Sequence, residues 1–270
     1  MAVRWCDLSE EIQNRFSMDN LVGIGRDINE DGIESVSDES SGKSTHYTID
    51  KIDYSSRLTA RFECGAYGAV DTWVYLALQK YSIKDMNVCV LGSADQGFGP
   101  WYESMVLNMG GIPITIDYNE VKYDSIRYKF WSIDTLKENI ASGFKFDCIL
   151  NISSVEHDGL GRYGDPINPD GDLETMNLLR SYLKLNGLMF LTVPVGNDSI
   201  IFNHHRIYGK HRLPKLLDKW LVVDSFGYND SLLTRDVKGG WIPIGDDGIP
   251  MFQWYPAYEP LFVLKNINPL

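Results

Sequence analysis

Short apolar segments of strand length alternate with segments of helical periodicity over much of this chain of 270 residues. Val88 to Leu91 is one such strand-like run, apolar residues then recur at helical spacing from Tyr102 to Met109, and a second run follows from Ile112 to Ile116. Strands that are buried on both faces and joined by helices form parallel sheets. The alternation therefore predicts an α/β fold around a parallel sheet.

The same alternation continues toward the end of the chain. Further strands are expected at Phe146 to Ile152, Leu188 to Val193, Leu221 to Val223 and Leu261 to Leu264, and further helices at about 69–81, 172–184 and 214–220. No internal repeat of 20 to 50 residues is present, which excludes solenoids and propellers.

The charge balance limits the partners of the protein. With 25 basic and 37 acidic residues the formal net charge is −12, which argues against a surface that binds nucleic acid phosphates nonspecifically. A single buried anionic site, such as one for a nucleotide, remains compatible with this charge, because net charge describes the far field. A hydrophobic content of 44% is enough for one substantial core.

Cysteine usage and hydropathy bear on the compartment. The four cysteines are widely spaced without a C-x-x-C pair, and Cys89 and Cys148 lie in the expected buried strands, as free core thiols do. This favours a reducing compartment such as the cytoplasm, although the Golgi lumen is compatible if an anchor precedes this chain. No stretch approaches about 18 consecutive apolar residues, so neither a signal peptide nor a membrane helix is expected in this chain.

Three glycines lie between the first expected strand and the helix that follows it. Gly92, Gly97 and Gly99 would let a ligand approach the backbone at a helix N-terminus, although a tight turn alone also requires glycine. Asp117 stands at the tip of the next strand, where a carboxylate accepts hydrogen bonds from ribose hydroxyls. Together these features indicate a site for a cofactor that contains adenosine.

The turn also discriminates between cofactors. It lacks the Gly-Lys-[Ser/Thr] ending of a phosphate-binding loop, which disfavours ATP hydrolysis. Gly97 and Gly99 are followed by Tyr102 where a dinucleotide-binding turn carries a third glycine, which counts against NAD. S-adenosylmethionine has no pyrophosphate and does not require that third glycine.

The densest polar segment, Ser153 to Pro166, follows the strand that ends at Ile152. His157 is the best candidate for a general base because the pKa of histidine lies near neutrality, although a histidine that only orders the loop is the alternative. A second polar cluster, Asn203 to Gly209, could reach the same cleft, with Arg206 alternatively pairing with a loop carboxylate. No spacing in these clusters resembles a metal-ligand motif, so we expect no metal.

Several segments resemble a family catalogued as a domain of unknown function, first described from Caenorhabditis proteins and similar to class I S-adenosylmethionine-dependent methyltransferases. They are Ser153 to Pro166, Gly171-Asp172, Val193 to Gly196 and His205 to Gly209. The family's first turn resembles Gly-Ser followed by Pro-Trp-Tyr-Glu, matched by Gly92-Ser93 and Pro100 to Glu103, whereas Ala94 to Gly99 enlarge the loop here.

The resemblance covers about residues 60 to 230 and implies a fold and a cofactor site. The implied fold is Rossmann-like, with a seven-stranded sheet of six parallel strands and one reversed strand, and helices on both faces. We expect residues 1–60 to be an acidic N-terminal extension with a mobile loop near Asp38 to Lys43, and residues 61–270 to be the methyltransferase-like domain. The residues expected to bind S-adenosylmethionine are Gly92, Ser93, Gly97, Gly99, Trp101, Asp117, Tyr118, Asn119 and Ser153.

The leading hypothesis is an S-adenosylmethionine-dependent O-methyltransferase that acts on a glycan or another hydroxylated small molecule. His157 would be the base, with Glu156 or Asp158 orienting it. The residues expected to line the acceptor pocket are Arg162, Tyr163, His205, Arg206 and Tyr208. Two alternatives stay open, a noncatalytic binding protein that retains the fold and an NAD-dependent oxidoreductase.

Overall fold

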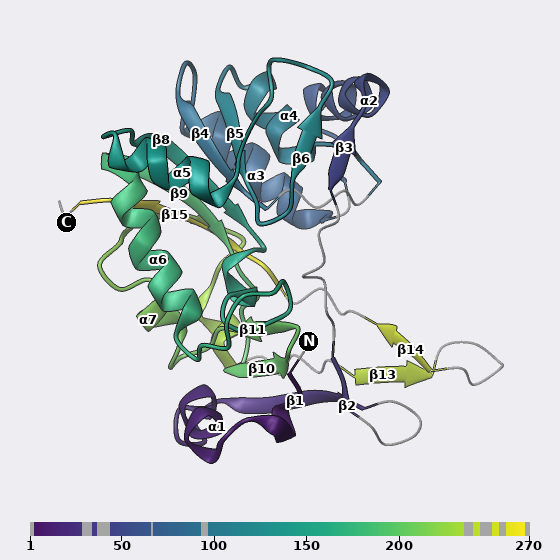
Figure 1. The fold of residues 1–270 in the computed structure, drawn as a ribbon, viewed down its shortest axis with the longest axis vertical. Coiled ribbons are helices and arrows are strands. Elements are labelled where there is room, and N and C mark those ends of the chain that lie inside the picture. The colour runs from purple at the N-terminus through teal and green to yellow at the C-terminus, as the bar shows by residue number, and fades with distance from the viewer. Residues whose placement is uncertain are drawn as a thin grey trace.

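A seven-stranded sheet organises the structure, a computed structural model that describes residues 3–28, 34–36, 44–65, 67–92, 97–234, 240–243, 250–253 and 258–267 (Figure 1). The strands of this main sheet are β4 (Asn87–Leu91), β5 (Ile112–Ile116), β7 (Lys129–Trp131), β8 (Phe146–Ile152), β9 (Leu183–Thr192), β12 (Leu221–Phe226) and β15 (Leu261–Lys265). Their spatial order is β12-β15-β9-β8-β4-β5-β7, and β15 alone runs in the direction opposite to the other six strands. The predicted fold class, a mostly parallel seven-stranded sheet of the class I methyltransferase type, is confirmed by this order.

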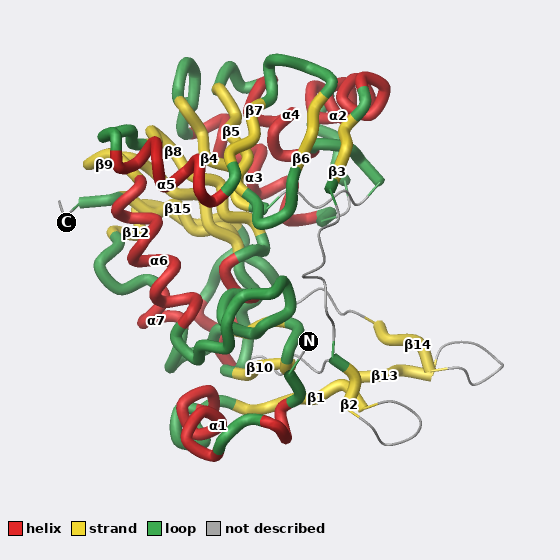
Figure 2. The backbone as a smooth tube through the Cα atoms, viewed as in Figure 1, coloured by secondary structure: helices red, strands yellow, loops and turns green. Residues whose placement is uncertain are grey.

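Helices cover both faces of the main sheet (Figure 2). On one face, α3 (Ala69–Lys80) and α4 (Trp101–Asn108) pack on a cluster that includes Val88 and Val90. On the other face, α5 (Ile133–Ala141), α6 (Gly171–Tyr182) and α7 (Leu213–Leu216) pack on a cluster that includes Cys89. Because successive side chains of a strand point to opposite faces, the apolar run of β4 contributes side chains to both layers.

Among the described helices, none is both long and apolar enough to cross a bilayer.

A smaller four-stranded sheet joins the N-terminal segment to an excursion between β9 and β12. Its strands are β1 (Gly23–Ile28), β2 (Glu34–Ser35), β10 (Ser199–Phe202) and β11 (His205–Ile207), in the order β11-β10-β1-β2. β1 runs parallel to β10, and Phe16 of α1 (Glu10–Ser17) packs with Phe202 and Leu160. The N-terminal segment therefore shares a sheet with residues 199–207, whereas the predicted mobile loop at 38–43 lies outside the described residues.

Shorter elements complete the described chain. They are the 3-10 helices η1 (Trp5–Asp7), η2 (Val155–His157) and η3 (Asp230–Thr234), the helix α2 (Ile49–Ala60), and the paired strands β3 (Thr45–Tyr47) with β6 (Val121–Tyr123) and β13 (Gly240–Pro243) with β14 (Pro250–Gln253). β7 and α5 carry no expectation from the sequence, and the three residues of β7 are too few for a clear periodicity. The expected helix at 214–220 is shorter, and β9 begins five residues earlier than expected, at Leu183, which pairs with Phe146.

The helix α2 packs on α4 at the glycine-rich turn. Ser55 and Ser104 share a hydrogen bond between their hydroxyl groups (2.7 Å), and both side chains are buried. Gly99 lies so close to α2 that a Cβ there would stand 2.6 Å from the Lys51 carbonyl oxygen. Gly97 also has a left-handed backbone, with a φ of +87° compared with +76° for Gly99. A Cβ at Gly97, however, would meet no atom of the described residues within 4 Å.

Replacement of the two glycines should separate steric contact from backbone strain. Gly97→Ala is expected to lower the free energy of unfolding by about 1 kcal/mol, the cost of a left-handed conformation. Gly99→Ala adds the clash with α2 and should lower it by about 2–4 kcal/mol. Chemical denaturation measures both values, and equal losses in the two variants would contradict the close approach of α2.

Candidate functional site

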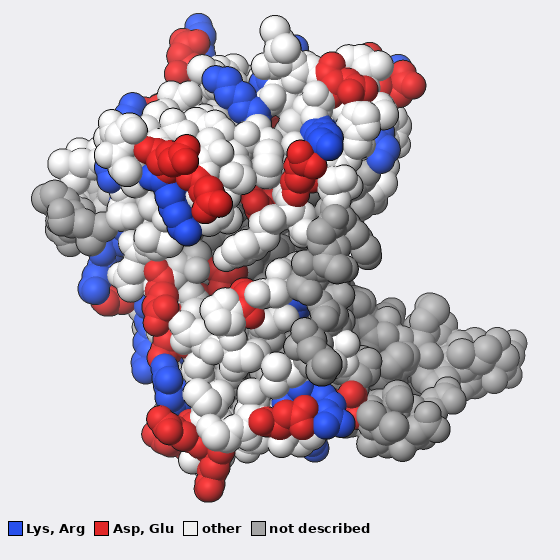
Figure 3. Space-filling view, in the orientation of Figure 1, with Lys and Arg blue, Asp and Glu red and all other residues white. Residues whose placement is uncertain are grey.

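A cavity of about 1000 Å³ opens at the carboxyl ends of β4, β5 and β8. The order of the main sheet reverses at β4, which has β5 on one side and β8 on the other, and open α/β sheets bind ligands at such a point. In the space-filling view, the molecule is hollowed between its upper part and the part that carries the smaller sheet (Figure 3). The predicted site residues that line the cavity are Gly92, Gly99, Trp101, Asp117, Tyr118, Asn119, Ser153, Glu156, His157, Asp158, Arg162, Tyr163 and His205.

Residues at the ends of β4, β5 and β8 form one side of the cavity. Gly92 follows β4 with a φ of +67°, a conformation that favours glycine, and its N–H donates to the Ile116 carbonyl (3.0 Å). The Asp117 carboxylate accepts a hydrogen bond from the backbone N–H of Asn119 (2.7 Å), which holds the tip of β5 in a turn. Asn151 of β8 is completely buried and lines the cavity, and its Nδ2 has no hydrogen-bond partner in the described structure.

The glycine-rich turn contributes less to the cavity than the sequence indicated. Gly99 lines the cavity, but its contact with α2 already accounts for a glycine there. Gly97 does not line the cavity. Trp101 lines it and also packs against Gly65, where a Cβ would approach the indole to 2.9 Å. Ser93 lies outside the described residues.

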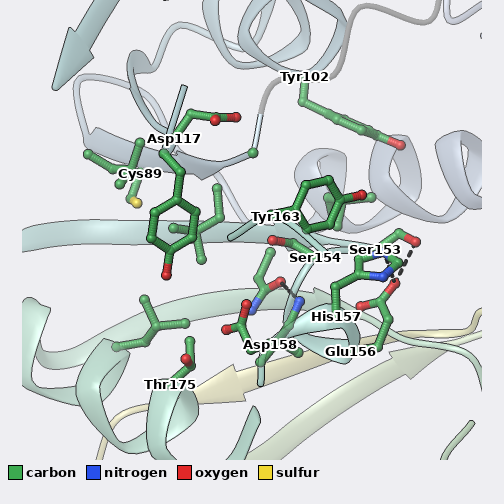
Figure 4. A pocket seen from close by; sticks show the side chains of 18 of the residues that line it. Cys89, Tyr102, Asp117, Ser153, Ser154, Glu156, His157, Asp158, Tyr163 and Thr175 are labelled. Atoms are coloured by element: carbon green, nitrogen blue, oxygen red, sulfur yellow. Dashed lines mark hydrogen bonds and ion pairs between the residues drawn. The ribbon is translucent and has the colours of Figure 1, made fainter. Parts of the chain in front are cut away.

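His157 and Glu156 form the opposite side of the cavity (Figure 4). His157 Nδ1 lies 2.5 Å from the His204 carbonyl oxygen, which can only accept, so the neutral ring carries its proton on Nδ1 and presents a lone pair at Nε2. Nε2 lies 3.6 Å from Glu156 Oε1. Burial, together with the nearby charge of Glu259, raises the pKa of Glu156 well above its ordinary value. This arrangement suits a histidine that takes a proton beside a carboxyl group.

Asp158 occupies a separate position in the same loop. Burial raises the pKa of its carboxyl to about 7, although a hydrogen bond with Thr175 of α6 opposes that rise. The next turn of the loop is held by Asp165, whose carboxylate accepts from the N–H groups of Gly159 (2.7 Å) and Gly161 (3.1 Å). Asp165 thus has a structural role in shaping the loop.

Of the five residues predicted to line an acceptor pocket, three line the cavity: Arg162, Tyr163 and His205. Arg162 lies over the ring of Tyr163, with its guanidinium carbon 5.3 Å from the ring centroid, and Tyr163 meets the edge of His157. His205 of β11 is buried. Burial is the main cause that lowers the pKa of His205 to about 3, and repulsion from His157 adds to it, so His205 is neutral at physiological pH. These rings make the wall beside His157 largely aromatic.

The other two, Arg206 and Tyr208, are completely buried and lie outside the cavity, which corrects their prediction as acceptor-binding residues. Tyr208 donates to Asp172 (2.9 Å), and Arg206 Nε lies 3.7 Å from the same carboxylate. Arg212 donates to Asp172 through Nε (2.9 Å) and Nη2. Burial opposes ionisation of Asp172, but Arg206 and Arg212 hold its pKa below the ordinary value.

Arg206 also fixes the backbone of the histidine loop. Its Nη1 donates to the carbonyl groups of Asp158 (2.5 Å) and Glu156 (3.3 Å), on both sides of His157. Its Nη2 donates to the Asn168 carbonyl (3.3 Å), at the far end of the loop. Within the polar cluster at residues 203–209, His205 lines the cavity, whereas Arg206 supports the backbone of the loop that carries His157.

Sequence reasoning missed Glu259 and Asn151. Glu259 lines the cavity because β15 runs against the other strands, which brings its first residues to the edge where β8 ends. Its position, 102 residues after His157 and in no polar cluster, carries no local signal. Asn151 could have been found, since a polar residue within the apolar run from Cys148 to Ile152 is unusual in a sheet buried on both faces. Among the described residues no group of three or more histidine, cysteine or acidic side chains could hold a metal ion.

The buried ion cluster around Asp172 predicts a large stability effect. Arg206→Met should lower the free energy of unfolding by about 3–5 kcal/mol, because it removes one of the two guanidinium groups beside the buried Asp172 and leaves the carbonyl groups of Glu156 and Asp158 without their donor. Arg15→Met, which removes an exposed ion pair with Asp170, should cost less than about 1 kcal/mol. Equal values for the two variants in chemical denaturation would show that Arg206 does not support the loop.

The chain was compared with solved structures and with curated proteins. SMU.776, crystallised with S-adenosylhomocysteine, is 15% identical over 71% of this chain and 48% of that chain, with a TM-score of 0.39. TehB from Haemophilus influenzae is 13% identical over 71% and 60%, with a TM-score of 0.41. The MycE methyltransferase from the mycinamycin biosynthetic pathway, crystallised with Mg and S-adenosylhomocysteine, is 13% identical over 52% and 36%, with a TM-score of 0.38.

This chain thus spans about half the length of the first of these structures. The fold assignment rests on the strand order of the main sheet and not on these likenesses. No curated protein matches the chain. The family described as Caenorhabditis protein of unknown function, DUF268, matches residues 85–237, which is more than half of the sequence. The protein is therefore a member of that family.

Proposed function

We propose that this protein is an S-adenosylmethionine-dependent methyltransferase that methylates a hydroxyl group of a glycan or another hydroxylated small molecule. The observation that carries the proposal is the composition of the cavity. Gly92, Asp117 and Asn151 lie on one side of it, and His157 with its neighbouring carboxyl group lies on the other. One cavity thus offers both a place for an adenosine cofactor and a base for an acceptor hydroxyl.

The residues on the first side fit S-adenosylmethionine. Gly92 leaves room for a ligand against the backbone, and Asp117 can accept hydrogen bonds from ribose hydroxyls. Asn151 Nδ2 is a buried donor without a partner, and such a donor is costly unless a ligand accepts from it. When bound, the cofactor would supply an activated methyl group on a sulfonium.

His157 would remove the proton of the acceptor. Methyl transfer from a sulfonium to an oxygen needs the oxygen nucleophile aligned and its proton taken up. His157 Nε2 carries the lone pair because Nδ1 donates to the His204 carbonyl. Glu156, 3.6 Å from Nε2, would form an ion pair with the ring once it is protonated.

The chemistry of the second side favours a hydroxylated acceptor. It combines the rings of Tyr163 and His205 with the carboxyl groups of Glu156 and Glu259, which matches the apolar faces and hydroxyl groups of a sugar. A polyanion is a poor fit, since the formal net charge is −12 and the face seen in Figure 3 has interspersed charges without a broad basic area.

Calorimetry with three ligands tests the cofactor. S-adenosylmethionine and S-adenosylhomocysteine are expected to bind, and NAD is expected not to bind. Asn151→Leu should weaken S-adenosylhomocysteine binding by about 10-fold or more, because it removes the buried donor. Absence of binding of both methionine-derived ligands at millimolar concentration would remove the proposal, and binding without any product would favour a noncatalytic protein.

A second measurement tests the base. His157→Ala should leave the affinity for S-adenosylhomocysteine nearly unchanged and lower methyl transfer by about two to four orders of magnitude. His46→Ala, which changes an exposed histidine paired with Asp124, is the control and should keep full activity. Mass spectrometry that follows the gain of one methyl group by candidate glycans gives the rate, and full activity of the His157 variant would end this assignment.

A further inference from the structure

Two carboxyl groups approach one serine hydroxyl behind His157. Ser153 Oγ lies 2.6 Å from Glu156 Oε1 and 3.3 Å from Glu259 Oε1. Glu156 Oε2 and Glu259 Oε2 are buried and make no hydrogen bond in the described structure, and all three residues line the cavity. Figure 4 shows the Ser153 hydroxyl turned toward the carboxyl group of Glu156, beside His157. We refer to Glu156, Ser153 and Glu259 as the carboxyl chain.

The number of protons in the carboxyl chain constrains its charge. Ser153 has one hydroxyl proton, so it can donate to only one of the two carboxyl groups. Both contacts are hydrogen bonds only if the other carboxyl group is protonated and donates to Ser153 Oγ. Two ionised carboxylates around one hydroxyl would also repel each other in a site of low polarity. Burial raises the pKa of Glu259 to about 7 and that of Glu156 well above its ordinary value, which agrees with this count.

The backbone of Ser153 is held in an unusual conformation that supports the arrangement. Its φ is +47°, in the left-handed region that residues other than glycine seldom adopt. The Ser153 N–H donates to the carbonyl oxygen of Thr192 (3.2 Å) and to its hydroxyl oxygen (3.0 Å). Such strain persists where the surrounding structure maintains it, and it is found at functional sites. The conformation here places a hydroxyl between two carboxyl groups.

The carboxyl chain continues directly to the proposed base. Glu156 Oε1, which accepts from Ser153, is the same atom that lies 3.6 Å from His157 Nε2. His157 Nδ1 is committed to the His204 carbonyl, so a proton gained or lost by the ring passes through Nε2. A continuous series of neighbouring groups that can exchange protons therefore runs from the imidazole of His157 to the carboxyl group of Glu259, and it consists of His157, Glu156, Ser153 and Glu259.

We propose that Glu156, Ser153 and Glu259 form a proton relay behind His157. This inference rests on the proposed methyl transfer. In that reaction the acceptor O–H bond breaks and an N–H bond forms at His157 Nε2, while a C–O bond forms and the C–S bond breaks with its electron pair left on sulfur. Glu259, which is protonated at rest, first releases its proton to water in the cavity. His157 gives its proton to the ionised Glu156, Glu156 passes one to Ser153, and Ser153 passes its own to Glu259, which restores the starting state.

Other charged groups near the relay do not replace it. His205 stays neutral because its pKa is lowered to about 3, and Arg206 meets Glu156 only at the backbone carbonyl. Asp158 carries a raised pKa of about 7 but bonds to Thr175 and not to Ser153. Tyr163 contacts His157 ring to ring, and Arg162 lies over the ring of Tyr163. A hydrogen bond with Thr192 partly opposes the raised pKa of Glu259.

Infrared spectroscopy of the ligand-free protein tests the shared proton. At pH 7 we expect a carbonyl band from a protonated carboxyl group that is altered by Glu259→Gln, Glu156→Gln and Ser153→Ala alike, because the three groups share hydrogen bonds. Asp158→Asn should remove only its own contribution, and Glu138→Gln, on the exposed face of α5, should change nothing. A spectrum in which the three variants leave the protonated band unchanged would overturn the relay, whether or not the cofactor binds.

The rates of the variants test the transfer itself, with the acceptor that gains a methyl group in the mass assay. Glu259→Gln and Ser153→Ala should each lower kcat by about 100-fold. The affinity of Glu259→Gln for S-adenosylhomocysteine should hardly change. The double variant should be no slower than either single variant, because one broken link already interrupts the relay. Additive losses, or a normal kcat in Glu259→Gln, would show that the residues act independently and would overturn the inference.

Discussion

The buried carboxylate of Asp172 is the contact on which the site depends. It lies at the start of α6, on the main sheet, and it binds Arg206, Tyr208 and Arg212 from the segment that carries the smaller sheet. A lone buried charge is unfavourable, so each partner requires the others. Arg206 then reaches the carbonyl groups on both sides of His157. The position of the proposed base is thus set by an ion cluster that touches neither side of the cavity.

The reversed strand β15 has a comparable effect on the chemistry. In a sheet of parallel strands only, the start of a strand lies at the edge opposite to the ligand site. Because β15 is antiparallel to β9, its N-terminal end lies beside the carboxyl ends of β8 and β9. Glu259 precedes β15 by two residues and therefore meets Ser153, which follows β8. Topology alone brings Glu259 next to the loop that carries Glu156 and Asp158.

Much of the fold could be predicted because its elements are buried on both faces. The apolar runs at 88–91, 112–116 and 146–152 are strands, and the helix expected at 69–81 is α3. The site was harder to predict, since a polar residue looks the same in sequence whether it meets a ligand or another side chain. Arg206 and Tyr208 were assigned to the acceptor and bind Asp172 instead, whereas Asn151 lay unnoticed at the end of an apolar strand.

The sequence by itself determined the order of strands and helices, the glycine-rich turn after β4 and the loop that carries His157. These features follow from hydrophobic periodicity and from the backbone freedom of glycine, which are local properties. Only the tertiary structure decided which charges neutralise one another and which face the cavity. Asp172 and Arg206 are 34 residues apart in the sequence, and Ser153 and Glu259 are 106 residues apart. Such pairs form only because the tertiary structure brings distant segments together. Burial then determines their protonation, because a charge removed from water needs a partner or a proton.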